Sequence, residues 1–233
     1  MRWGYCLVVV LLMACSSSDD HFQSISKKSK NLGKYFENKD HYELQIIYTQ
    51  INRDEHNNPS LKSYKFNYDS THYFYPASTV KMPVAFLALQ KLQELGIDKW
   101  DVMKTDSARV PQTRAHTDTT SVSGLPSVAH YIEKIFAVSD NDAYNRLYEF
   151  LGQDYINRSL REKKVFTNSR VVTRVGISGF STADNRYTNP VSFYDKDNKE
   201  IYAQAETQAA GDYLESLQPV SYTHLTLPTT PYV

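Results

Sequence analysis

The segment STVKMPVAFLALQKLQEL, residues 78–95, predicts a long helix near the centre of a 233-residue chain. Apolar residues leave little of the first half of this segment polar, so we expect that half to be buried on most sides. Gly96 follows, and glycine is the residue that most often ends a helix. A chain of this length can bury one substantial hydrophobic core, and this helix is the natural centre of it.

The residues on either side of this helix predict a mixed fold. Residues 42–53 alternate and are rich in β-branched and aromatic residues, a turn-forming cluster follows at 54–59, and residues 63–68 predict a strand that pairs back as a hairpin. A hairpin followed by helices is the order of an α/β or α+β domain. Further helices are expected at 25–36, 127–138, 142–151 and 154–164, with irregular chain at 98–126 and mainly loop at 165–205.

Ser78 and Lys81 form a candidate catalytic pair at the start of the central helix. Their spacing of three puts both side chains on one face of a helical turn. The helix N-terminus favours negative charge developing on the serine, and burial would lower the lysine pKa so that it can act as a base. The same spacing recurs at Ser24 and Lys27, in a polar region without a buried helix, so spacing alone is a weak signal.

The triplet Ser139-Asp140-Asn141 interrupts two predicted helices and supplies further polar groups. A serine can relay a proton, and an asparagine can bind a substrate amide or the lysine ammonium. The alternative is that the triplet only caps the following helix, because Ser, Asp and Asn all do so.

Together, Ser78-x-x-Lys81 and Ser139-Asp140-Asn141 resemble the first two motifs of class A β-lactamases and penicillin-binding proteins. The resemblance covers residues 30–160 and implies a β-lactamase-like sandwich of antiparallel sheet and helices beside an all-helical lobe. By the same resemblance, Ser78 would attack a β-lactam or acyl-peptide carbonyl, with half of the oxyanion hole from its own amide. Lys81 would take its proton, Ser139 would pass one to the leaving nitrogen, and Asn141 would hold the substrate.

Three departures from the family pattern limit this resemblance. The third motif, Lys-Thr-Gly, is absent, and the nearest string is Lys104-Thr105-Asp106, before the second motif. The deacylating glutamate is also missing, since residues 173–176 read Thr-Arg-Val-Gly. Asp184 could replace it, or could serve the turn beside Asn185. Residues 171–194 do not align with the usual loop.

These observations leave three functions open. The first is a serine β-lactamase-related hydrolase that acts on β-lactam amides through an acyl-enzyme. The second is a D-alanyl-D-alanine peptidase, esterase or penicillin-binding protein with slow deacylation, because no activated water is evident. The third is a non-catalytic surface lipoprotein that uses the fold for binding, which the 18 tyrosines would suit.

The N-terminal residues predict export and lipid anchoring. Arg2 precedes an apolar run too short to span a bilayer, and residues 1–14 predict a signal peptide. The run ends at Cys15, which resembles the acylated cysteine of bacterial lipoproteins, and residues 15–24 predict a polar tether. An ordinary signal peptide that happens to contain a cysteine is the alternative. The expected location is the bacterial cell envelope, periplasmic or at the outer membrane or surface.

The net charge and the histidine and cysteine content exclude several classes of binding partner. The net charge of zero argues against a nucleic-acid binder, and scattered histidines with two cysteines argue against a metal or other cofactor. The expected partners are a small-molecule β-lactam or a peptidoglycan peptide, with a monomeric chain held at a membrane through Cys15.

The C-terminal residues differ from the rest of the chain. Residues 221–233 contain no Lys, Arg, Asp or Glu and resemble the translated read-through of a sequencing adapter. The expectation is a partial catalytic domain at 25–219, a non-native tail at 220–233, and an inactive fragment whose late strands and third motif are missing.

Overall fold

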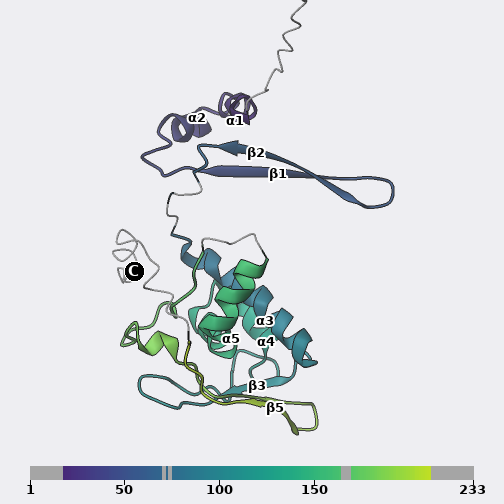
Figure 1. Ribbon diagram of the computed structural model, residues 1–233, viewed down its shortest axis with the longest axis vertical. Coiled ribbons are helices and arrows are strands. Elements are labelled where there is room, and N and C mark those ends of the chain that lie inside the picture. Colours follow the sequence, from purple (N-terminus) through teal and green to yellow (C-terminus); the bar gives the residue numbers. More distant parts are fainter. Residues whose placement is uncertain (1–17, 70–71, 73–74, 164–168, 211–233) are drawn as a thin grey trace, which may run out of the picture. The chain divides into compact units, whose positions relative to one another are not determined.

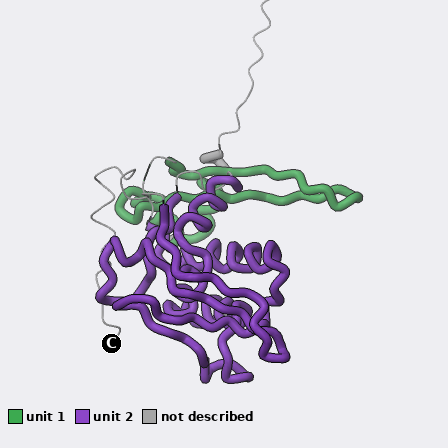
Figure 2. The backbone as a smooth tube through the Cα atoms, turned by 60° about the horizontal axis from the view of Figure 1, so that its bottom comes forward, with its two compact units in different colours: residues 1–74 green, residues 75–233 purple. Residues whose placement is uncertain are grey.

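The computed structural model describes residues 18–69, 72, 75–163 and 169–210, which fall into two compact units, residues 1–74 and 75–233 (Figure 2). Helices and antiparallel strands occur together, which confirms the expected α+β class. The signal peptide, Cys15 and the tail at 220–233 lie outside the described residues. Among the described helices, none is both long and apolar enough to cross a membrane.

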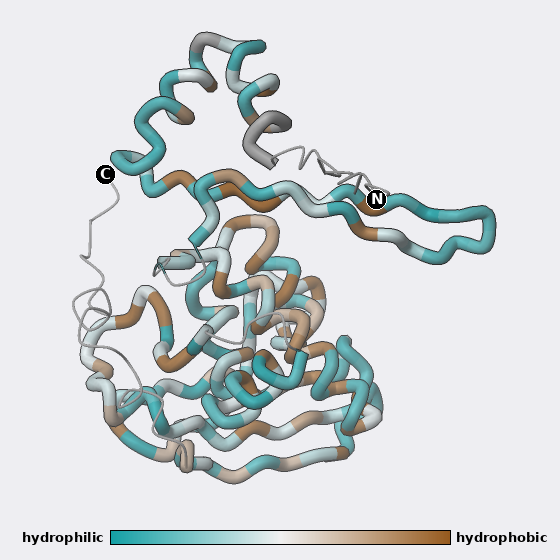
Figure 3. The backbone as a smooth tube through the Cα atoms, turned by 45° about the horizontal axis from the view of Figure 1, so that its top comes forward, coloured by the Kyte–Doolittle hydropathy of each residue, from teal (hydrophilic) through white to brown (hydrophobic). Residues whose placement is uncertain are grey.

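The first unit is built on the predicted hairpin. Strands β1 (Ile46–Arg53) and β2 (Pro59–Phe66) pair antiparallel from Ile46 opposite Phe66 to Arg53 opposite Pro59. The Asp54 carboxylate closes the turn by accepting the backbone N–H groups of His56 at 2.9 Å and Asn58 at 2.8 Å. The hairpin is therefore confirmed, and its tip is hydrophilic (Figure 3).

Two helices precede this hairpin where one was expected at 25–36. They are α1 (Ser18–Ser26) and α2 (Lys30–Glu37), so α1 occupies part of the segment predicted as a tether. The rings of Phe22 and Phe36 both lie against Phe66, with centroids 5.9 and 4.7 Å away. These aromatic contacts fix the helices on β2, an effect of packing that local sequence patterns do not report.

The second unit holds the main core. Its helices are α3 (Lys81–Leu95), α4 (Val128–Val138) and α5 (Asn141–Glu162), and a short 3-10 turn, η1 (Ala77–Val80), leads into α3 (Figure 1). Gly96 ends α3 with a left-handed φ of 69°, and the Ser127 hydroxyl caps α4 by accepting the His130 N–H at 3.2 Å. Helix α5 breaks at Gly152 (φ 73°, ψ 156°), close to the two predicted helices.

A three-stranded antiparallel sheet in this unit was not predicted. Strands β3 (Val102–Thr105), β4 (Val191–Tyr194) and β5 (Glu200–Gln204) lie in that order, where irregular chain and loop were expected. Met103 and Phe193 are fully buried, and the Phe193 ring meets Phe150 of α5 at 5.1 Å. The sheet thus closes the side of the core that the helices leave open.

Candidate active site

Ser78 lies in the 3-10 turn η1 and not in the first turn of an α-helix, which corrects the expected start of the helix. Ala77 holds a left-handed φ of 45°, unusual for a residue with a side chain. The turn is pinned by Thr79, whose N–H donates to the Pro76 carbonyl at 3.0 Å and whose hydroxyl donates to it at 2.5 Å. Ser78 is exposed, at the N-terminal end of a continuous helical segment.

Lys81 joins the two candidate motifs. Its side chain is buried, with 2% of the residue exposed, and its Nζ donates to Ser139 Oγ at 3.0 Å and to Asn141 Oδ1 at 2.6 Å. A further hydrogen bond goes to the Ser139 carbonyl. The structure therefore brings Lys81, Ser139 and Asn141 together. No hydrogen bond between Ser78 and Lys81 side chains is present among the described residues.

Burial lowers the pKa of Lys81, and the negative charge of Asp140 opposes this change. The three oxygens around Nζ match the three N–H donors of an ammonium group, yet all three are neutral. Neutral acceptors stabilise an ammonium less than a carboxylate would. The lysine is thus held in place by groups that leave it able to lose its proton.

The Ser139-Asp140-Asn141 triplet also serves the helix that follows it. Ser139 is left-handed (φ 56°, ψ 40°) and ends α4, while the Asp140 carboxylate caps α5 by accepting the Ala143 N–H at 2.8 Å. The capping interpretation is therefore correct for Asp140. It does not exclude a role of the triplet in the candidate site, because Ser139 and Asn141 both accept hydrogen bonds from Lys81.

The loop at 171–190 lies directly against Asn141. A Cβ at Gly176 would come within 2.1 Å of Asn141 Nδ2, so no other residue fits there without moving this asparagine. Asn145 of α5 holds the neighbouring residue, since it donates to the Val175 carbonyl at 3.0 Å and accepts the Val175 N–H at 2.8 Å. The loop and the candidate site are thus one packed unit.

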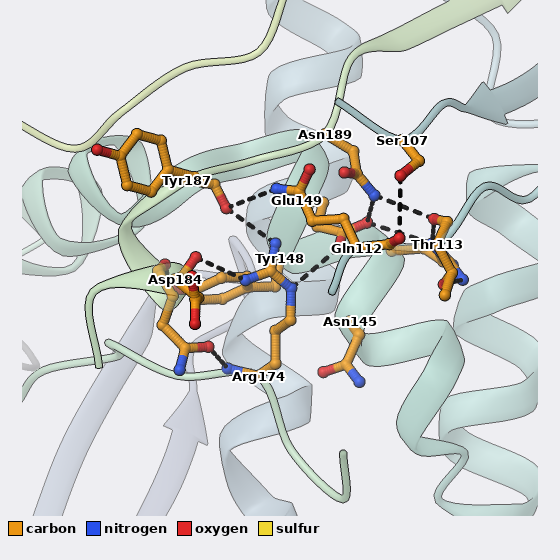
Figure 4. Close-up of polar contacts among 12 residues, drawn as sticks. Ser107, Gln112, Thr113, Asn145, Tyr148, Glu149, Arg174, Asp184, Tyr187 and Asn189 are labelled. Atoms are coloured by element: carbon orange, nitrogen blue, oxygen red, sulfur yellow. Dashed lines mark hydrogen bonds and ion pairs between the residues drawn. The ribbon is translucent and has the colours of Figure 1, made fainter. Parts of the chain in front are cut away.

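A buried ionic cluster anchors the same loop (Figure 4). Glu149 of α5 binds Arg174 Nε at 2.9 Å and Arg146 Nη1 at 3.4 Å, and the Asn189 amide donates to it at 3.1 Å. Arg174 also donates to the Tyr187 carbonyl at 2.8 Å. Burial raises the pKa of Glu149, while the charges of Arg174 and Arg146 lower it. Sequence reasoning missed this cluster, because Glu149 is one of several charged residues of α5 and no local pattern marks it as buried.

Two other candidates occupy structural positions. Asp184 accepts the Ser181 N–H at 2.8 Å and the Ser181 hydroxyl at 2.6 Å, so its carboxylate serves a turn. Lys104 and Thr105 lie in β3, where Thr105 is fully buried and the Lys104 ammonium lies 4.1 Å from the centre of the Tyr194 ring. Neither contacts Lys81 through a described hydrogen bond.

Within residues 18–69, 72, 75–163 and 169–210, no group of three or more His, Cys, Asp or Glu side chains is placed to hold a metal ion.

Comparison with known proteins gives one result. The model of the Beta-lactamase enzyme family matches residues 26–221, most of the chain. No curated protein and no solved structure matches the chain.

Proposed function

Since the chain belongs to the beta-lactamase enzyme family, we propose that it is a serine hydrolase that cleaves β-lactam amide bonds through an acyl-enzyme on Ser78. The supporting observation is the contact of Lys81 with Ser139 and Asn141, at 3.0 and 2.6 Å. This contact assembles, in one place, groups from two motifs that are distant in the sequence. Burial of the lysine gives it the lowered pKa that a general base needs.

The proposed acylation moves one proton twice. Lys81, in its neutral form, takes the hydroxyl proton of Ser78 as the serine oxygen bonds to the amide carbon. The amide C–N bond then breaks, and its nitrogen receives a proton through the Ser139 hydroxyl, which lies 3.0 Å from Lys81 Nζ. Lysine returns to its neutral form, so the charges balance. Asn141 holds the substrate through the amide group that also meets Lys81.

A second candidate function has the same acylation step with slow deacylation, as in a D-alanyl-D-alanine peptidase or penicillin-binding protein. The observation that favours it is Gly176. This residue sits on Asn141 with no room for a side chain, in the segment where the family resemblance would place a deacylating glutamate. Asp184, the other candidate, is engaged by Ser181. Without a carboxylate to activate water, the acyl-enzyme would persist.

Intact mass over time separates these functions. The full-length gene product is mixed with a penicillin, and we expect a mass increase equal to the whole drug. A short-lived adduct with product release supports a β-lactamase, and a persistent adduct supports the second function. Ser78→Ala should prevent the adduct. Ser24→Ala, which alters the other serine with a lysine three residues later, should form it normally. Absence of any adduct would leave the non-catalytic binding protein as the remaining function.

We also propose that the protein is a lipid-anchored monomer of the bacterial envelope, because Cys15 follows an apolar leader. Cys15→Ala should move the protein from the membrane fraction to the soluble fraction. Retention of the variant in membranes would contradict the anchor.

A further inference from the structure

A pocket lies at the break in α5, away from Ser78. The pocket has a volume of about 280 Å³. Helix α3 and helix α5 lie side by side here (Figure 1). Lys91 is ten residues after Lys81 on α3, which is about 15 Å along the helix axis. The pocket is therefore separate from the group of Lys81, Ser139 and Asn141.

The charged groups that line this pocket are mostly basic. Lys91 comes from α3, Arg158 from the second half of α5, and Arg186 from the 3-10 turn η2 (Asp184–Arg186). Asp154 is the acidic residue among the lining residues, and one of its oxygens accepts the Ala210 N–H at 2.8 Å. Three positive groups from three separate segments thus line the pocket with one carboxylate. Outside the lining, the charge of Glu94 acts on Lys91, and Glu162 lies 4.0 Å from Arg158.

Lys91 is held by neutral groups. Its Nζ donates to the Phe150 carbonyl at 2.6 Å and to Gln204 Oε1 at 2.8 Å, and lies 4.3 Å from the centre of the Phe150 ring. Burial lowers the pKa of Lys91 to about 8, although the charge of Glu94 opposes this change. The ammonium has a third donor, to which an oxygen of a bound anion would bind.

Arg186 also has donor capacity to spare. Its Nη2 donates to the Ala209 carbonyl at 2.7 Å, while its Nε is buried without a hydrogen-bond partner. Buried donors are nearly always paired in folded proteins, so Arg186 is a side chain with unused donor capacity that lines the pocket.

The backbone adds to the positive potential. Gly152 breaks α5 with a φ of 73° and lines the pocket, so the helical segment that follows begins at the pocket. The N-terminal end of a helix carries partial positive charge and favours anions.

Another pocket of similar size shows that this lining is not a general property of the surface. It has a volume of about 270 Å³ and is lined by three aspartates and one lysine, Asp98, Asp101, Asp195 and Lys196, together with apolar and aromatic residues. The two pockets are thus opposite in charge.

We propose that the pocket formed by Lys91, Arg158 and Arg186 binds a small oxyanion, a carboxylate or a phosphate group. The ligand's oxygens accept hydrogen bonds from the ammonium and the guanidinium groups, and its charge offsets the excess of basic residues. This proposal does not depend on the chemistry at Ser78.

Calorimetric titration of the full-length gene product tests it, with inorganic phosphate and with succinate as separate probes. Sodium chloride at equal ionic strength is the blank. We expect binding in the millimolar range by at least one probe, and a change in the amide NMR signal of Gly152. Phosphate binding without succinate binding identifies a phosphate ligand, and the reverse identifies a carboxylate.

Two variants and one matched control locate the site. Arg158→Gln and Arg186→Gln should each weaken binding by about tenfold, because each removes a charge-assisted hydrogen bond. The side chain of Arg158 is 59% exposed, so its variant should fold even if the Arg186 variant does not. Arg161→Gln removes the same charge from the same helix outside the lining residues and should bind normally. No binding by either probe, or equal weakening in the Arg161 variant, would overturn the proposal.

Discussion

Lys81 and Glu149 are two buried ionisable residues of the second unit, and they differ in the kind of group that binds them. Lys81 meets neutral oxygens from Ser139 and Asn141. Glu149 lies between two guanidinium groups, those of Arg174 and Arg146. The hydrogen-bond partners of the lysine are therefore neutral dipoles, although the charge of Asp140 also acts on it, whereas the glutamate is paired with full charges.

This difference suits Lys81 to proton transfer and Glu149 to holding the fold together. A buried charge without a counter-ion loses part of the energy that keeps it ionised, so its proton state can change. A buried charge paired with opposite charges is expensive to disturb. Both groups are linked to Asn141. Glu149 anchors the loop that contains Arg174 and Gly176, and Gly176 packs on Asn141, which binds Lys81. In the proposed function, the loop fixes the asparagine while the lysine transfers the proton.

Removing the lysine side chain should have the largest effect. Lys81→Ala should slow acylation by a penicillin by at least about a thousandfold, since general-base catalysis contributes factors of roughly 10² to 10⁴ and a positioned contact is lost with it. The measurement is the rate of adduct formation by intact mass. Lys104→Ala is the matched control, because Lys104 lies in β3 beside Tyr194 and should acylate as the native protein does. A native rate in the Lys81 variant would show that another group takes the serine proton.

Neutralising Glu149 should lower the stability of the protein and not its rate of acylation directly. Glu149→Gln leaves Arg174, whose side chain is 1% exposed, without a carboxylate. Breaking a buried ion pair costs about 3–5 kcal/mol, which lowers Tm by about 10 °C in a chain of this size. Thermal unfolding followed by circular dichroism measures this.

Glu162→Gln is the control for this prediction, because the pair of Glu162 with Arg158 is long, at 4.0 Å, and both side chains are exposed. Exposed pairs contribute little, so its Tm should stay within about 2 °C of the native value. Equal Tm values for the two variants would show that the buried cluster does not anchor the fold.

The two regions were not equally predictable from sequence. The hairpin, the central helix, the Ser127 cap and the break at Gly152 follow from local signals, namely alternation, apolar periodicity and glycine. Strands β3, β4 and β5 do not, because each has only four or five residues and owes its pairing to distant partners. Val102–Thr105 reads as irregular chain until Val191–Tyr194 lies beside it.

The candidate site also contains some residues that the sequence predicts and others that it does not. Lys81 and the Ser139-Asp140-Asn141 triplet stand out as motifs, so their meeting could be expected from a family resemblance. Glu149 looks like any other acidic residue of a helix, and only the distant Arg174 shows that it is buried. Gly176 carries no signal either, since its close approach to Asn141 depends on how the loop folds.

The smallest predicted effect is a change in the pH dependence of acylation. Burial lowers the pKa of Lys81 below its usual 10.5, so the acylation rate should rise with pH and reach its midpoint below that value. The charge of Asp140 opposes this change. Asp140→Asn should therefore move the midpoint to lower pH, while asparagine still caps α5.

The free energy of unfolding should also rise with pH, as the acylation rate does. Between the folded pKa of Lys81 and 10.5, the unfolded chain holds a proton that the folded chain has lost, so stability rises with pH across this window. Asp140→Asn should extend the window to lower pH. Asp142→Asn is the matched control, because this neighbouring carboxylate pairs with Arg146 at 3.1 Å and should leave the midpoint of acylation unchanged. Equal midpoints in all three proteins would mean that Lys81 is not the titrating base, and an equal shift in the Asp142 variant would mean that the effect is only one of overall charge.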